Sequence, residues 1–114
     1  MREIKFRAWD KLTTKMYGVE FINFADFRDK EGSTILMQYT GLKDKNGKEI
    51  YEGDIVTSLD WDGKFLCQYD SKFACFEFYD DQTDTFLGGA SYGDKVPLLE
   101  VIGNVYEHPE LLNQ

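Results

Sequence analysis

The sequence predicts a mainly β protein: a small antiparallel barrel with extra N-terminal strands and a short C-terminal helical turn. Three observations support this fold class. Nine Phe, seven Tyr and two Trp supply large side chains that favour strands. Short apolar runs recur about every eight to twelve residues between clusters of turn residues. Both prolines lie late in the chain, at Pro97 and Pro109, so most of the chain can join sheet hydrogen bonding.

The chain of 114 residues is expected to form a single domain. We divide it into an N-terminal β extension, residues 1–40, and a barrel-like part, residues 41–114. In the extension, the alternation of apolar and polar positions predicts a strand over residues 3–9. Residues 17–27 fit either a short helix or a strand. A charged loop and a further strand, 34–40, complete the extension.

Two turn motifs begin the barrel-like part. Asn46-Gly47 is typical of a two-residue hairpin turn, which needs positive φ at both positions. Asn and Gly reach that region at the least cost. Glu52-Gly53-Asp54 predicts another turn before the next extended run. We therefore assign Asn46, Gly47, Gly53 and Asp54 a structural role, because turn chemistry accounts for them fully.

The remaining strands are expected at residues 55–61, 64–69, 73–79, 85–87 and 98–106. Asp62-Gly63 predicts a hairpin between the first two of them. Gly103 predicts a bulge or a close backbone approach within the last strand. Pro109 fits the first position of a helical turn that ends the fold.

The chain is acidic, and its charge is unevenly distributed. The formal net charge is -8, yet residues 1–15 carry five basic against two acidic side chains. Nucleic-acid binding depends on basic side chains that neutralise phosphates, so nucleic acid is not the expected partner. Two alternatives stay open. One is a nucleic-acid-binding barrel that uses the basic segment with Trp9, and the other is an acidic mimic of nucleic acid that inhibits a host DNA-binding protein.

No residue pattern predicts catalysis, a metal site or a cofactor, so we expect the protein not to be an enzyme. The only histidine, His108, precedes a proline, and the chain has neither a nucleophile motif nor a phosphate-binding glycine loop. Cys67 and Cys75 would face each other if the turn between their strands centres on Ser71. In a reducing cytoplasm we expect them as reduced core or half-buried residues. The acidic cluster around Asp80 is expected to be solvated.

The aromatic content is larger than the interior of so small a barrel can hold. Aromatic rings beside acidic side chains would form a groove for a basic or proline-rich peptide. The alternative, which we favour for these rings, is that they close the barrel ends and form a subunit interface, so a homo-oligomer is also open. The candidate partner-binding surface comprises Arg7, Trp9, Trp61, Tyr69 and Tyr92.

Three blocks of the sequence resemble a known family. The blocks are residues 5–10, 39–56 and 101–112, and they are similar, in this order, to signature blocks of the YopX family of bacteriophage and prophage proteins. Residues 24–33 resemble a variable insert, which makes the charged loop of the extension variable. The resemblance implies an SH3-like barrel in the later part of the chain and a phage-encoded protein of the bacterial host cytoplasm. The family has no established biochemical activity, so the resemblance assigns no functional residue.

Together these observations predict a phage accessory protein that acts as a non-enzymatic, protein-binding module in the host cytoplasm. The expected partner is a host or phage protein, and no cofactor is expected. No membrane association is expected either, because the chain has no apolar run of about 18 residues and no leader with a small-residue cleavage site.

Overall fold

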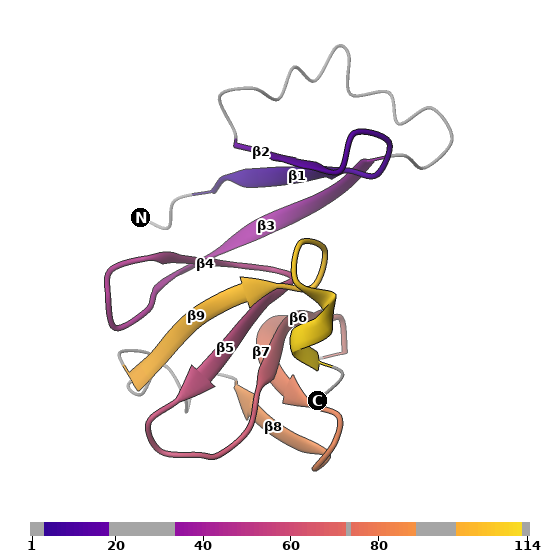
Figure 1. Cartoon of the computed structure of the whole chain (residues 1–114). Helices are drawn as coiled ribbons and strands as arrows, with labels where there is room; N and C mark the ends of the chain where they lie inside the picture. Colours follow the sequence, from indigo (N-terminus) through magenta and orange to yellow (C-terminus); the bar gives the residue numbers. More distant parts are fainter. Residues whose placement is uncertain (1–3, 19–33, 73, 89–97, 113–114) are drawn as a thin grey trace.

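The structure, a computed structural model, describes residues 4–18, 34–72, 74–88 and 98–112 of the chain (Figure 1). Within these ranges it contains nine strands, and a short 3-10 helix near the C-terminus. The strands are β1 (Phe6–Asp10), β2 (Lys15–Tyr17), β3 (Thr34–Lys43), β4 (Glu49–Tyr51), β5 (Asp54–Ser58), β6 (Phe65–Asp70), β7 (Cys75–Asp80), β8 (Thr85–Gly88) and β9 (Leu99–Asn104), and the helix is Pro109–Leu112. The predicted fold class is confirmed. No helix in the described ranges is long and apolar enough to cross a membrane.

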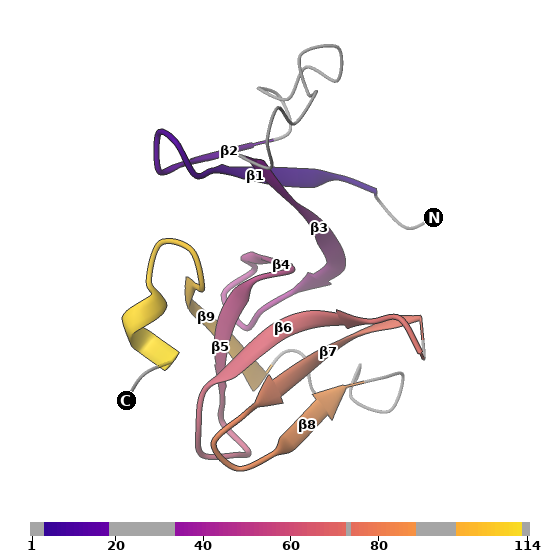
Figure 2. The ribbon, with the colours of Figure 1, turned by 90° about the vertical axis from the view of Figure 1, so that its right-hand side faces the viewer.

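The strands form two antiparallel sheets. The first has the order β2-β1-β3-β4 and the second the order β8-β7-β6-β5-β9. Figure 2 shows that β1, β2 and the first part of β3 lie above the SH3-like barrel, whose strands are strongly curved. β3 joins these two parts, because its first half pairs with β1 and its second half with β4. The division that we placed at residue 40 therefore falls inside one continuous strand.

A cluster of buried side chains forms the barrel core. Its members are Ile50, Val56, Phe65, Cys67, Phe78, Leu87 and Leu99. They alternate along their strands, as Phe65 and Cys67 do on β6, because successive side chains of a strand point to opposite faces. Burying one large apolar side chain contributes about 1.5–3 kcal/mol, so this cluster is the main stabilising element of the barrel.

Three hairpins use the same turn. In each, an aspartate at the end of the first strand accepts a hydrogen bond from the backbone N–H two residues later, at 2.9–3.0 Å. The last loop residue has a φ of 51–53°. The aspartates are Asp10, Asp70 and Asp80, and the residues with positive φ are Thr14, Ala74 and Asp84. Asp80 is thus buried in a turn, and the prediction of a solvated cluster is wrong for this residue.

The Asn46-Gly47 hairpin is present, but its turn differs from the predicted one. Among these two residues only Gly47 has a positive φ, of 80°. The Gly47 N–H donates to the backbone oxygen of Asp44 at 3.0 Å, and Asp44 N–H donates to Lys48 O at 2.8 Å. Positive φ at both Asn46 and Gly47 was therefore a wrong prediction, because the loop starts earlier, at an aspartate whose side chain organises it.

The two cysteines do not face each other, which corrects the predicted register. Cys67 lies opposite Phe78, and Cys75 lies opposite Asp70. The loop between β6 and β7 follows Asp70 and is not centred on Ser71, so the pairing is shifted. Both thiols are free, with Cys67 buried and Cys75 half-buried, as expected for reduced cysteines.

The predicted hairpin at Asp62-Gly63 is confirmed, although its loop is longer than a two-residue turn. Val56 and Phe65, one on each side of this loop, are the paired residues nearest to it. Gly63 has a φ of 116°, and a Cβ atom there would lie 2.6 Å from Asp80 Oδ2. Glycine at this position therefore lets the loop pack closely against the neighbouring hairpin.

The bulge predicted near Gly103 is also present. Ile55 lies opposite Gly103, whereas Val56 lies opposite Val101, so β9 accommodates one extra residue. A Cβ atom on Gly103 would lie 2.8 Å from His108 Nδ1. The bulge thus brings the backbone of β9 into close contact with the segment that leads to the C-terminal helix.

We expect Gly103→Ala to destabilise the fold by about 1–3 kcal/mol, because overpacking forces neighbouring groups apart. The added methyl group would also lie 2.9 Å from Leu111 Cδ1 and displace the C-terminal helix. Urea unfolding would measure the loss. Unchanged stability would contradict the prediction, because it would mean that the helix yields to the methyl group without cost.

Candidate functional site

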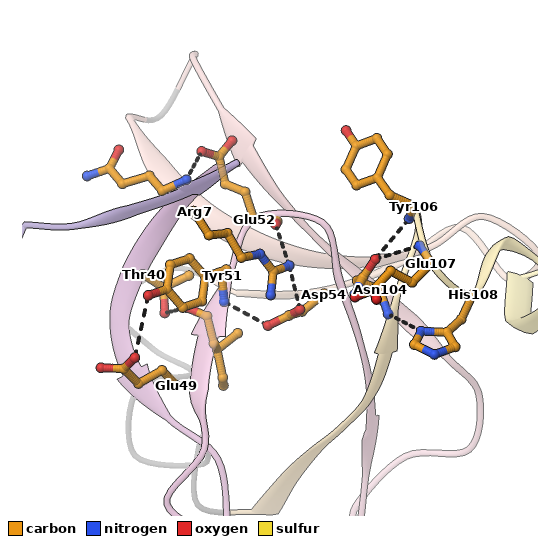
Figure 3. Close-up of polar contacts among 12 residues, drawn as sticks. Arg7, Thr40, Glu49, Tyr51, Glu52, Asp54, Asn104, Tyr106, Glu107 and His108 are labelled. Atoms are coloured by element: carbon orange, nitrogen blue, oxygen red, sulfur yellow. Dashed lines mark hydrogen bonds and ion pairs between the residues drawn. The ribbon is translucent and has the colours of Figure 1, made fainter. Parts of the chain in front are cut away.

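A buried ion pair joins the N-terminal sheet to the barrel. Arg7 on β1 donates to Asp54 Oδ1 at 2.7 Å and to the backbone oxygen of Glu52 at 3.2 Å (Figure 3). Its guanidinium also lies over the Tyr51 ring, 4.7 Å from the centroid. Asp54 Oδ2 accepts the Tyr51 N–H at 2.8 Å. These contacts hold the turn between β4 and β5 against β1, and we call the pair the Arg7–Asp54 clamp.

Water has little access to this clamp. The side chains of Arg7 and Asp54 are 14% and 2% exposed. Burial raises the pKa of Asp54, even though Arg7 and the Tyr51 N–H favour its ionised form. The Nε atom of Arg7 is buried without a hydrogen-bond partner in the described part of the chain. The clamp is therefore sensitive to the loss of either partner, because the remaining charge would stay buried and unpaired.

Trp9 extends the same junction between the N-terminal sheet and the barrel. Its ring is buried and stacks on Tyr106, with centroids 6.0 Å apart and an interplanar angle of 24°. Gly53 has a φ of 87°, and a Cβ atom there would lie 3.1 Å from Met37 Sδ and 3.2 Å from Tyr106 Cε2. Both the backbone conformation and the packing therefore favour glycine at this position.

Two surface hollows lie beside this junction, between β3 and the β6–β7 hairpin. One, of about 320 Å³, is lined by residues of β3, β6 and the segment after β9. The other, of about 470 Å³, is lined by residues of β3 and of the end of the β6–β7 hairpin. Both are also lined by Glu52 and Tyr69, and we call them together the β3–β6 groove. Most of the residues that line it are apolar or aromatic, such as Leu36 and Phe76.

Glu52 is the one charged residue among those that line the groove. Its Oε1 atom accepts the Gln38 N–H at 2.9 Å. None of the ion pairs among the described residues involves its carboxylate. Tyr69 is 47% exposed and packs edge-on against Phe76, with centroids 5.3 Å apart. The groove therefore combines an exposed aromatic wall with a carboxylate that forms no ion pair with any other described residue.

The residues predicted to form a partner-binding surface occupy different environments. Arg7 and Trp9 are largely buried and hold the junction together, so they do not present an open surface. Tyr69 lines the groove. Trp61 is 52% exposed in the loop between β5 and β6, and it does not line the groove. Tyr92 lies outside the described residues.

Glu52, Leu36 and Gln38 were not predicted from the sequence. Glu52-Gly53-Asp54 was interpreted as turn chemistry alone, and the turn is present, but the Glu52 side chain also reaches into the groove. The sequence feature that could have indicated Glu52 is an acidic residue beside Gly53, a glycine that the backbone conformation requires. Leu36 gave no signal, because its strand carries apolar residues at consecutive positions on both faces.

Asp44, at the start of the Asn46-Gly47 turn, anchors this hairpin to β9. Its Oδ1 atom accepts the N–H groups of Asn46 and Lys48, and its Oδ2 atom accepts the Val101 N–H, all at 2.9 Å. Burial acts to raise the pKa of Asp44, but the three N–H donors outweigh it and hold the pKa below 3.8. The ionised carboxylate therefore stabilises the fold.

We expect Asp44→Asn to destabilise the fold by about 2 kcal/mol at neutral pH, because an amide replaces a charged acceptor. The folded pKa of Asp44 lies below the unfolded value of 3.8, so its stabilisation is present above pH 3.8 and is lost as the pH falls through the folded pKa. Urea unfolding of both proteins at decreasing pH should show a difference that shrinks below this value. A difference that grows in acid would contradict the prediction.

Four potentially reactive side chains of the described residues, those of Cys67, His108, Asp44 and Asp54, are buried or take part in structural contacts. Burial, above all, raises the pKa of the Cys67 thiol, which keeps it protonated. The Nδ1 atom of His108 accepts the Asn104 N–H at 3.2 Å. The carboxylates of Asp44 and Asp54 bind the donors described above. Within the described ranges, no group of three His, Cys, Asp or Glu side chains is placed to hold a metal ion.

The fold and this junction define a small antiparallel SH3-like barrel with an N-terminal sheet attached to it through one shared strand. A family model described as YopX protein matches residues 23–113. The chain therefore belongs to the YopX family, and the resemblance found in the sequence is confirmed.

Two solved structures share this fold over nearly their whole length. Protein EF1440 from Enterococcus faecalis is 26% identical with a TM-score of 0.70, and the match covers 98% of this chain and 99% of that chain. Protein yopX from Bacillus subtilis is 23% identical with a TM-score of 0.57 and the same coverage, 98% and 99%. The second likeness shows the fold alone. A comparison with curated proteins found no match.

Proposed function

We propose that this YopX-family protein is a non-enzymatic accessory module of phage or prophage origin that binds a protein in the bacterial host cytoplasm. Its binding surface is the β3–β6 groove. The observation that carries the proposal is the combination of the exposed ring of Tyr69 with the Glu52 carboxylate in an otherwise uncharged hollow. Protein interfaces favour such sites, with aromatic anchors at the centre and few charges among them.

A non-enzymatic role is supported by the state of three potentially reactive groups, although the half-buried thiol of Cys75 lines the groove. The Cys67 thiol is buried, and burial raises its pKa. The Asp54 carboxylate is paired with Arg7, and His108 Nδ1 is occupied by a backbone N–H. General acid–base or nucleophilic catalysis requires such groups to reach a substrate. A binding role requires only the surface of the groove.

The basic N-terminal segment gives less support to a nucleic-acid partner. Lys5 forms an ion pair with Glu49 and lies over the Tyr39 ring, 5.0 Å from its centroid. Arg7 is buried in its pair with Asp54. These two cations are therefore engaged with carboxylates of the protein, whereas phosphate binding depends on cations that reach solvent.

The proposal is tested by expressing a tagged copy in a bacterial host and identifying the molecules that co-purify at low and moderate salt. We expect one stoichiometric protein in the wild-type sample. The variant with Tyr69→Ala and Glu52→Gln together should lose it, because the aromatic wall and the carboxylate are both removed. Trp61→Ala serves as the control, since it removes an exposed aromatic residue outside the groove.

Two results would contradict the proposal. Nucleic acid that co-purifies at low salt and is released at moderate salt would indicate a phosphate-binding surface instead. A partner protein that the groove variant retains, but that Trp61→Ala loses, would place the binding surface at the loop between β5 and β6.

A further inference from the structure

Beside the groove, one edge of the first half of β3 has no strand partner among the described residues. Tyr39 N–H donates to the backbone oxygen of Lys5, the residue just before β1, and alternate residues of an antiparallel strand bond to neighbours on opposite sides. Leu36 and Gln38 therefore direct their backbone groups away from β1. At Gln38 both groups are bonded to Glu52, through its Oε1 atom and its N–H. At Leu36, beyond the end of β4, neither group has a partner among the described residues.

Across the same hollow, the end of β6 has a second edge without a strand partner in the described part of the chain. Cys67 O accepts the Gly53 N–H at 2.9 Å, so the backbone groups of Cys67 point away from β7. Those of Tyr69, two residues later, point the same way. Pairing with β5 ends at Leu66, and the Tyr69 backbone groups that point away from β7 have no partner within the described ranges. Leu36 and Tyr69 both line the hollow of about 320 Å³ between the two edges.

We propose that the β3–β6 groove accepts an extended, basic peptide segment as an added strand. The segment lies in line with β4, beyond its end, along the unpaired edge of β3. Its backbone pairs with the N–H and C=O groups of Leu36. A Lys or Arg side chain of the segment pairs with the carboxylate of Glu52, which lies where β4 ends. This inference rests on the proposed function and names the chemistry of its partner.

Charge and packing favour a basic peptide as the segment bound in the groove. The chain carries a net charge of -8, so a basic segment is attracted to it, whereas a second copy of the chain is repelled. Glu52 supplies the one charge of the groove wall, and it forms no ion pair among the described residues. The aliphatic stem of a Lys or Arg can pack along the exposed Tyr69 ring while its charged end reaches Glu52. Added strands of this kind derive affinity from the main chain and selectivity from alternate side chains.

The test begins with a displayed library of random peptides roughly ten residues long, selected against the wild-type protein. We expect enriched peptides with Lys or Arg at one fixed position, β-branched or aromatic residues at alternate positions, and no central proline. Fluorescence anisotropy with an enriched peptide should show about tenfold weaker binding to Glu52→Gln, because a charge-assisted bond is lost. The control Glu100→Gln, which alters an exposed ion pair on β9, should bind as the wild type does.

Two further changes test the strand geometry. Leu36→Pro removes the free N–H without removing a bond to β1, and it should weaken binding about tenfold or more, whereas Leu36→Ala keeps the N–H. N-methylation of the peptide at successive positions needs no change in the protein. It should weaken binding only at alternate residues, because only these face β3.

The inference is overturned if no peptide is enriched, if enriched peptides lack a basic residue, or if Glu52→Gln and N-methylation leave binding unchanged. A dimer of the wild type that Leu36→Pro dissociates would also overturn it, because a second copy would then occupy the edge. If a host protein still co-purifies through Tyr69 while no peptide binds, the proposed function stands and strand addition fails.

Discussion

Replacing Asp54 by Ala should destabilise the fold by about 3–5 kcal/mol, because the Arg7 guanidinium would remain buried without its partner. Arg7 cannot lose its charge to escape this penalty. The substitution also removes the acceptor of the Tyr51 N–H in the turn between β4 and β5. Urea unfolding at neutral pH would measure the difference in the free energy of unfolding.

An exposed ion pair provides the matched control. Lys45 Nζ lies 3.0 Å from Glu100 Oε1, and their side chains are 34% and 42% exposed. Lys45→Ala should therefore cost no more than about 1 kcal/mol. The double variant with Arg7→Met and Asp54→Leu should recover much of the loss, since apolar side chains often replace a buried pair well. A single-variant loss as small as that of the control would contradict the clamp.

Replacing Trp9 by Ala should cost about 3–5 kcal/mol, the range typical of large aromatic side chains removed from a core. Trp9 is 9% exposed and stacks on Tyr106, so its loss would leave a cavity between the N-terminal sheet and the barrel. Thermal and urea unfolding would both record the effect. The expected loss follows from the structural role of Trp9, whichever partner the groove binds.

The second tryptophan is the natural control for this experiment. Trp61 is 52% exposed, so Trp61→Ala should change stability by no more than about 0.5 kcal/mol. Each variant leaves one tryptophan, and the emission of Trp9 should lie at shorter wavelength than that of Trp61, because Trp9 is shielded from water. Equal stability losses for the two variants would contradict the different burial of the two rings.

Most of the strands and turns could be predicted because their causes are local, whereas β2 was not predicted as a strand. Alternating side chains, the positive φ of Gly63 and Pro109 at the start of the helix act locally, and each is found where it was predicted. The Cys67–Cys75 pairing was wrong because the β6–β7 loop ends on Ala74 with a φ of 51°. Alanine rarely adopts such a conformation, so the residue types of the loop did not indicate this turn.

The site could not be predicted to the same degree, because its causes are contacts between distant parts of the chain. The Arg7–Asp54 clamp joins residues separated by 47 positions. Arg7, which was expected on a binding surface, is instead a largely buried residue that stabilises the fold. The importance of Glu52 depends on the end of β4 and the free edge of β3 lying side by side. Neither periodicity nor turn chemistry contains that information.

The most direct test of the groove as a binding surface is amide hydrogen exchange of the protein alone and with its co-purified partner. We expect slower exchange on binding at the amides of Leu36 and Tyr69, which lack backbone partners among the described residues. The amides around Phe86 on the outer strand β8 should not change, although that ring is 55% exposed. Protection confined to β8, with Leu36 and Tyr69 unaffected, would contradict the account.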